Sequence, residues 1–239
     1  HSYPHASVLL HFFIVTGWTG HAHGRENQRL AWQDLSDMTV QPLLAANAPV
    51  IRALRLPDTY AITCAGELGT GPFLERLSRS IGKSIRMLQL REKELPFDEL
   101  EELAINIQSM TRPARVPVLV NSSMPDSMLH RFQGLHLTSP DLMACDQRPA
   151  YELVAASCHD RNELDKAASL GLDFVVLSPV MKTPSHPQAE ALGLQRMAEL
   201  IKNYPLPVYA LGGMNNKQLD EIQSLGAHGI AMMRNAWES

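Results

Sequence analysis

The chain has 239 residues, of which 45% are hydrophobic and 19% are charged, and its formal net charge is −4. This length and composition predict one large globular domain, or one domain plus a fragment. The net negative charge excludes a broad binding surface for a nucleic acid polymer, and no apolar run approaches the roughly 18 residues that span a membrane. The three cysteines form no CxxC pair, which excludes a disulfide framework and favours a cytoplasmic protein.

Residues 1–57 predict a strand over 7–15, a loop rich in glycine, histidine and asparagine, a short strand at 30–32 and a helix near 48–56. The chain starts without methionine, directly in the strand-like segment, so we expect further sequence upstream. His21 and His23 lie two residues apart in the loop. They are either metal ligands on one face or polar residues of a hairpin loop, and the lack of an accompanying cysteine or carboxylate favours the loop.

From Thr59 onward short apolar runs alternate with segments of helical periodicity. The runs are almost continuously apolar, which is typical of parallel strands buried on both faces. We count eight of them, at 59–63, 84–90, 117–121, 134–138, 153–158, 174–180, 207–211 and 229–233.

Helical signals fill the gaps between these runs. Apolar residues from Phe97 to Ile107 share one helical face after Pro96. Asp160 with Glu163 resembles a capping box, and a glycine ends the helix that follows. Eight strands that alternate with helices predict an α/β fold, a (β/α)8 TIM barrel over residues 58–239, in which the last helix is short or absent.

In such a barrel the carboxyl ends of the strands form the mouth of the active site. Arg91 and Lys93 follow the second strand, so they are expected in this mouth, although a solvated charge pair is the alternative. Gly212 and Gly213 follow the seventh strand, where their amides can approach an anion, although a tight turn also uses glycine. Arg234 follows the eighth strand and would add a cation to this anion site, although a surface position is the alternative.

The other strand ends supply many hydrogen-bond donors and few carboxylates. Only Asp141 is well placed to bind a metal. Glycoside hydrolysis needs paired carboxylates, so the mouth favours a phosphorylated ligand instead. The candidate binding groups are Gln89, Asn121, His136, Thr138, Ser157 and His159.

Seven short motifs occur in order on the successive strands: QLREK (89–93), VNSS (120–123), GLHLTSPDL (134–142), ASCH (156–159), SPVMKTPSHP (178–187), LGGM (211–214) and GAHGIAMM (226–233). Together they resemble the thiamine-phosphate synthase/TenI superfamily over residues 59–239. The resemblance implies binding of phosphorylated thiamine precursors. The synthases of this superfamily join a hydroxymethylpyrimidine diphosphate to a thiazole phosphate and release diphosphate with the help of Mg²⁺.

The resemblance also implies a role for each group at the mouth. Arg91 and Lys93 would hold the diphosphate of the pyrimidine substrate, and Ser157 would contact that substrate near its reacting centre. Positioned cations and donors stabilise the charge that develops on a leaving diphosphate.

The thiazole phosphate has its own set of groups in the resemblance. Thr183 and Ser185 would hold it, and the amides of Gly212 and Gly213 would complete the site.

The sequence departs from the superfamily at several of these positions. The expected Asn-Asp pair after the third strand reads Asn121-Ser122, so one of two carboxylates for Mg²⁺ is missing and only Asp141 remains. This weakens the expected Mg²⁺ site. A lysine expected in the sixth-strand loop is His186, and Pro179 stands where thiazole tautomerases carry histidine. A synthase is therefore one expectation, and a binding or regulatory barrel is the alternative.

Residues 1–57 carry a second set of motifs, which are YPH (3–5), VLLHFFIV (8–15), GRENQRLAW (24–32) and PLLAANAPVIRAL (42–54). They resemble the carboxyl-terminal part of MutT-type Nudix hydrolases. In that family an asparagine that matches Asn47 recognises an oxidised guanine base, although Asn47 also suits a helix cap. The catalytic helix of that family, which carries its carboxylates, is missing. Residues 91–95 resemble part of its motif but do not match it, because Pro96 would disturb the helix. We therefore expect a fusion of an 8-oxo-dGTP diphosphatase with the barrel.

Overall fold

The computed structural model describes residues 2–3, 6–7, 15–27, 29–35, 37–44, 47–182 and 190–238. The chain divides into two compact units, His1–Arg55 and Leu56–Ser239. Each unit is described by itself.

The first unit contains little regular structure. Strands β1 (Ser2–Tyr3) and β2 (Ala6–Ser7) pair in antiparallel fashion, and helix α1 spans Ala48–Arg55. Most of the strand expected over 7–15 lies outside the described residues. The strand expected at 30–32 is wrong, because these residues have no regular structure and no partner strand among the described residues. Trp32 is 80% exposed and stacks on the ring of Trp18 instead.

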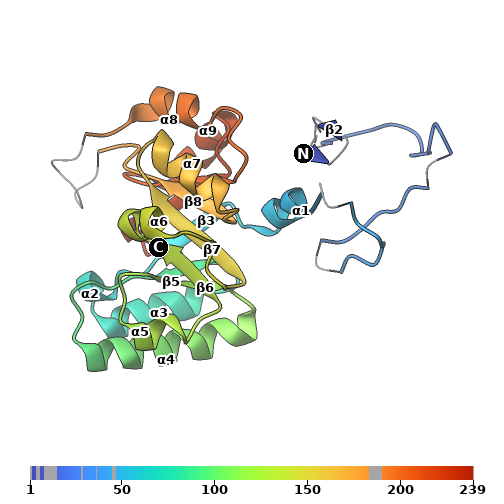
Figure 1. Ribbon diagram of the computed structural model, residues 1–239. Coiled ribbons are helices and arrows are strands. Elements are labelled where there is room, and N and C mark those ends of the chain that lie inside the picture. Colours follow the sequence, from blue (N-terminus) through green and yellow to red (C-terminus); the bar gives the residue numbers. More distant parts are fainter. Residues whose placement is uncertain are drawn as a thin grey trace. The chain divides into compact units, whose positions relative to one another are not determined.

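The second unit is a closed barrel of eight parallel strands. Figure 1 shows these strands with the helices of the unit around them. Its strands follow one another around the ring in chain order, and β10 closes the ring against β3. This confirms the barrel predicted from the eight apolar runs. The strands are β3 (Thr59–Ile62), β4 (Leu88–Leu90), β5 (Val118–Asn121), β6 (Gly134–Leu137), β7 (Leu153–Cys158), β8 (Phe174–Leu177), β9 (Val208–Ala210) and β10 (Gly229–Met232).

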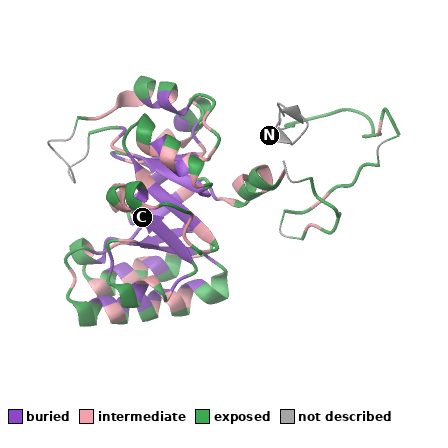
Figure 2. Ribbon diagram, viewed as in Figure 1, coloured by how far each residue is buried: buried purple, intermediate pink, exposed green. Residues whose placement is uncertain are grey.

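Helices cover the outside of this ring, and the buried strands stand out in Figure 2. One apolar cluster lies between the strands and the helices, and a smaller one fills the barrel interior around Tyr60, Phe174 and Tyr209. The two clusters explain why the runs are apolar on both faces. The helices are α2 (Ala65–Leu68), α3 (Thr70–Ser80), α4 (Phe97–Ala114), α5 (Asp126–Leu129), α6 (Ser139–Ala144), α7 (Arg161–Ser169), α8 (Gly193–Ile201), η2 (Asn216–Gln218) and α9 (Leu219–Ser224).

Two of the predicted helix features, the apolar stripe of α4 and the cap of α7, can be compared with the structure. On α4 the expected stripe is buried from Leu100 to Ile107, but Phe97 is 48% exposed because it stands in the first turn, beyond the barrel core. Asp160 caps α7 by accepting the amide of Glu163 at 2.9 Å. Within the described ranges, none of the helices is both long and apolar enough to cross a membrane.

The carboxyl-terminal element is a short 3-10 helix, η3 (Arg234–Ala236), as the sequence predicted. Trp237 follows it and is buried. Its indole N–H donates to the carbonyl oxygen of Ile62 at 2.9 Å, and its ring meets the ring of Phe73 edge-on at 4.7 Å. The side chain of Trp237 therefore joins the end of β3 to helix α3.

Candidate functional site

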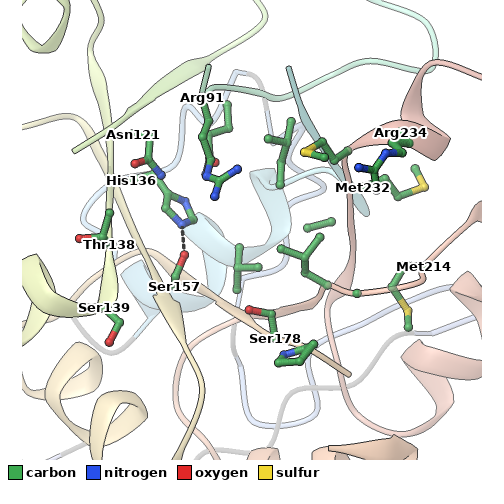
Figure 3. Close-up of a pocket in the computed structure, with 18 of the residues that line it drawn as sticks. Arg91, Asn121, His136, Thr138, Ser139, Ser157, Ser178, Met214, Met232 and Arg234 are labelled. Carbon is green, nitrogen blue, oxygen red and sulfur yellow. Dashed lines mark hydrogen bonds between the residues drawn. The ribbon is translucent and has the colours of Figure 1, made fainter. Parts of the chain in front are cut away.

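A pocket of about 680 Å³ opens at the carboxyl ends of the strands. It is lined by residues in or just after every strand of the ring, and Figure 3 shows the side chains of Arg91, His136 and Ser157 around a common space. This volume lies in the range of small-molecule sites. We call one part of it the rim (Arg91, Lys93, Gly212, Gly213 and Arg234). The floor is Gln89, His136 and Ser157 together with the buried Tyr60, which is hydrogen-bonded to Gln89 and His136 but does not itself line the pocket.

The first part of the rim follows β4. Arg91 and Lys93 both line the pocket, while Glu92 between them turns away and is buried. The Glu92 carboxylate accepts the amides of Ala65 at 2.7 Å and Gly66 at 3.0 Å, at the start of α2. The alternation of side chains along the chain thus places both cations in the mouth. Burial lowers the pKa of Arg91, which still remains a cation.

The second part of the rim follows β9 and requires glycine. Gly212 has a φ of 105°, and a Cβ there would lie 3.0 Å from the carbonyl oxygen of Met181. Gly213 has a φ of 66°, and its Cβ would lie 2.9 Å from the carbonyl oxygen of Lys182. Neither glycine amide donates to an acceptor among the described residues. The turn therefore both needs glycine and offers two amides to the pocket.

The helix that follows this turn is already capped. Asn215 accepts the amide of Lys217 at 3.0 Å, and its own amide donates to Gln218 at 3.0 Å. The amides of Asn215 and Lys217 are therefore used within the cap, while no acceptor is found for the two glycine amides among the described residues.

The third part of the rim is Arg234, which lines the pocket beside η3. Its guanidinium meets the carboxylate of Glu67 through two contacts of 2.6 Å and 2.8 Å, and this pairing raises the pKa of Arg234. Arg234 was expected to be a phosphate-binding cation, but much of its charge is compensated at this position. No sequence motif predicts this partner, because Glu67 and Arg234 are 167 residues apart in the chain.

A chain of four hydrogen-bonded side chains forms the floor. Nε2 of Gln89 lies 3.1 Å from the hydroxyl oxygen of Tyr60, which lies 3.3 Å from Nδ1 of His136. Nε2 of His136 lies 2.9 Å from Oγ of Ser157, as the dashed line in Figure 3 marks. Burial and the nearby charge of Arg91 lower the pKa of His136 to about 3, so the ring is neutral near pH 7. Sequence reasoning missed Tyr60, which resembled an ordinary core residue.

Ser122, which replaces the expected carboxylate, contacts Asp141. The hydroxyls of Ser122 and Thr138 both donate to Oδ2 of Asp141, the latter at 2.6 Å. Among the described residues no group of three or more histidine, cysteine, aspartate or glutamate side chains could hold a metal ion. Asp141 is thus held by two hydroxyls, and position 122 supplies no second carboxylate beside it.

A second carboxylate lies beside the pocket after β7. Glu163 accepts from the amide and from Nδ1 of His159, and also from the hydroxyl of Ser139. His159 and Ser139 line the pocket. The capping box expected at Asp160 is therefore only half formed, because Glu163 turns to the pocket residues.

Several expected residues are not part of this described pocket. Thr183, Ser185 and His186 lie outside the described residues. Asn47 belongs to the first unit, next to α1, and its proposed contact with a nucleobase stays a prediction. His23 places Nδ1 3.2 Å from the carbonyl oxygen of His21, which is a contact within the loop.

A family model described as thiamine monophosphate synthase matches residues 59–236. The chain belongs to this family. A protein of Aquifex aeolicus, provisionally named thiamine-phosphate synthase 2, is 35% identical over 181 residues, which cover 74% of this chain and 96% of the relative. The thiamine-phosphate synthase of Syntrophomonas wolfei is 32% identical and covers 73% of this chain and 85% of the relative.

Among solved structures, the thiamine phosphate pyrophosphorylase of Pyrococcus furiosus superposes with a TM-score of 0.60 at 21% identity, over 74% of this chain and 85% of that one. This supports the barrel fold. The thiamine monophosphate synthase family accounts for the second unit, while the MutT-type resemblance of residues 1–57 stays a prediction.

Proposed function

We propose that the barrel is a thiamine-phosphate synthase that joins a hydroxymethylpyrimidine diphosphate to a thiazole phosphate. In this reaction the bond from the pyrimidine methylene carbon to the diphosphate oxygen breaks, and its electron pair leaves with the diphosphate. The thiazole ring nitrogen forms the new bond to that carbon with its lone pair. No proton has to be lost, so the site must mainly hold two anionic substrates and stabilise a third anion as it leaves.

The observation that carries this proposal is the shared pocket of the β4 cations and the β9 glycine amides. Arg91 and Lys93 supply full charges suited to a diphosphate. Gly212 and Gly213 supply two amides suited to a single phosphate group. Two separated anion sites in one pocket match two phosphorylated substrates, with the reacting atoms between them.

The polar groups near the floor suit a nitrogen heterocycle. The side-chain oxygen of Asn121 already accepts the amide and hydroxyl of Ser123, at 3.0 Å and 2.7 Å. Its side-chain NH₂ is therefore the part that Asn121 can offer to a ligand. Together with Ser157, it gives the pyrimidine ring hydrogen-bond donors below the diphosphate.

The family implies Mg²⁺, and we propose that this chain binds the ion weakly. Magnesium prefers hard oxygen ligands, usually carboxylates together with substrate phosphates. Here Asp141 is the carboxylate that matches a family Mg²⁺ ligand, position 122 adds no second one, and one oxygen of Asp141 is used by Ser122 and Thr138. The residues thus fit the ion poorly, and the cations of the rim take the larger share of the diphosphate charge.

Two measurements test the synthase proposal. Calorimetry should show binding of the pyrimidine diphosphate and of the thiazole phosphate, and mixing both with the full chain should produce thiamine phosphate and diphosphate. Binding of neither substrate would overturn the proposal.

A second candidate, a binding or regulatory barrel, is favoured by Ser122. A barrel without the second carboxylate would bind the precursors and turn them over slowly or not at all. Binding by calorimetry without product formation, even at high Mg²⁺, would select this candidate.

A further inference from the structure

We propose that Tyr60 and His136 are positioning residues that fix the hydroxyl of Ser157 as a hydrogen-bond donor to the bound pyrimidine diphosphate. The inference rests on the proposed function for the identity of the ligand. The direction of the hydrogen bonds rests on the floor geometry alone.

The direction of these hydrogen bonds is set at their buried end, between Gln89 and Tyr60. The NH₂ group of Gln89 can only donate, so the hydroxyl oxygen of Tyr60 accepts this bond at 3.1 Å. Tyr60 is fully buried, and among the described residues the remaining acceptor for its own proton is Nδ1 of His136 at 3.3 Å. The opposite direction would leave the buried phenol proton without an acceptor, which is costly.

The tautomer of the His136 imidazole then decides which group donates in the next hydrogen bond, the one to Ser157. A neutral histidine carries one proton on its ring nitrogens, and Nδ1 accepts from Tyr60. The proton therefore sits on Nε2, which donates to Oγ of Ser157 at 2.9 Å. Both ring nitrogens of His136 are thus used within the protein, so His136 acts on the substrate through Ser157.

Ser157 then has its own proton left to give. Its oxygen accepts from His136, and among the described residues Oγ makes no other hydrogen bond. Because Ser157 lines the pocket, its proton is available to an acceptor on the ligand. A ligand with a donor at this point would meet two donors facing each other, so the chain of bonds also selects the ligand.

Nuclear magnetic resonance of the full chain labelled with ¹⁵N-histidine tests the direction without any substrate. The ring signals of His136, assigned from their loss in His136→Gln, should show the tautomer with the proton on Nε2. In Tyr60→Phe the second tautomer should become populated. A wild-type ring protonated on Nδ1, or a tautomer unchanged in Tyr60→Phe, would overturn the proposal.

Tyr209→Phe is the matched control. Tyr209 is another buried tyrosine of the barrel interior, but its hydroxyl donates to the carbonyl oxygen of Pro57. This variant also loses one buried hydroxyl and should leave the His136 tautomer unchanged. The wild-type spectrum decides the direction even if Tyr60→Phe does not fold.

Kinetics and binding test the link to the ligand. Tyr60→Phe and Ser157→Ala should each lower kcat/KM by roughly tenfold, the size of one lost hydrogen bond, and the double variant should lose little more. Fully additive losses would overturn the link between the two residues. If the expected tautomer is found but no thiamine phosphate forms, the proposed function fails and the hydrogen-bond direction stands.

Discussion

The rim and the floor of the pocket present different kinds of polar group. The rim offers cations and bare amides, such as Arg91, Lys93 and Gly213, and much of it is open to solvent. The floor offers neutral groups such as Tyr60 and His136, which are buried and hydrogen-bonded to one another. Exposed groups can supply charge at little cost to folding, whereas buried groups must be mutually satisfied. We therefore expect the rim to control which ligand charge is bound and the floor to control how the ligand is oriented.

The largest expected effect tests the rim. Arg91→Ala should lower kcat/KM for thiamine phosphate formation by about 10²–10³-fold, because removing one donor to developing charge has this size. Steady-state kinetics with the pyrimidine diphosphate would measure the loss. Arg86→Ala is the control, since Arg86 is exposed at the opposite end of the same strand region and should retain activity.

The next effect tests what holds the rim in place. Glu92→Gln should lower the free energy of unfolding by about 1–3 kcal/mol, because one of the buried amide contacts at Ala65 and Gly66 loses its acceptor. Urea unfolding would measure this change. Glu94→Gln changes an exposed neighbour and should have little effect. Equal stability of the two variants would contradict the anchoring role of Glu92.

The floor is tested by pH. His136 has a pKa of about 3 in the folded protein and about 6.5 when unfolded. Between these values the unfolded chain binds a proton that the folded protein does not, so stability falls as the pH drops from about 6.5 toward 3. This contributes about 1.4 kcal/mol per pH unit.

A variant without the imidazole isolates the contribution of this proton to the free energy of unfolding. His136→Gln should have a shallower decline in unfolding free energy between pH 5.5 and 4.5 than the wild type, by about 1.4 kcal/mol. Urea unfolding at both pH values would measure the slopes, and Tyr209→Phe should keep the wild-type slope. Parallel slopes in His136→Gln and the wild type would show that His136 is not held neutral.

The smallest effect concerns the metal. Ser122→Asp places a second carboxylate beside Asp141 and removes a hydrogen bond, which should destabilise the metal-free protein by about 1 kcal/mol. Mg²⁺ should reverse this loss by binding the folded state. Melting temperatures with and without Mg²⁺ would measure the reversal, with Ser122→Asn as the uncharged control. A response to Mg²⁺ as large in the wild type would contradict the weak site.

The barrel and the rim could be predicted from local patterns. Buried parallel strands leave continuous apolar runs, and strand ends in a barrel meet at one face. Arg91 and Gly212 could thus be assigned to one mouth from their positions after strands. The sequence predicts only a possible turn at 212 and 213. The requirement for glycine depends on the backbone of 181–182, which lies next to the turn in the fold.

The floor could not be predicted in the same way. Tyr60 lies in an apolar run and looks like core, and its role depends on Gln89 and His136 from two other strands. The role of Glu67 could not be predicted for the same reason, because its partner Arg234 lies 167 residues away in the chain. The predicted strand at 30–32 failed because a strand pattern has no meaning without a partner.

The burial of Trp237 limits which changes the segment after β10 can accept. Here the indole is only 2% exposed, and Arg76 also holds the carbonyl oxygen of the same residue at 3.1 Å. Replacing Trp237 with alanine would therefore empty a buried site against the ring of Phe73 and leave the carbonyl oxygen of Ile62 without its indole donor.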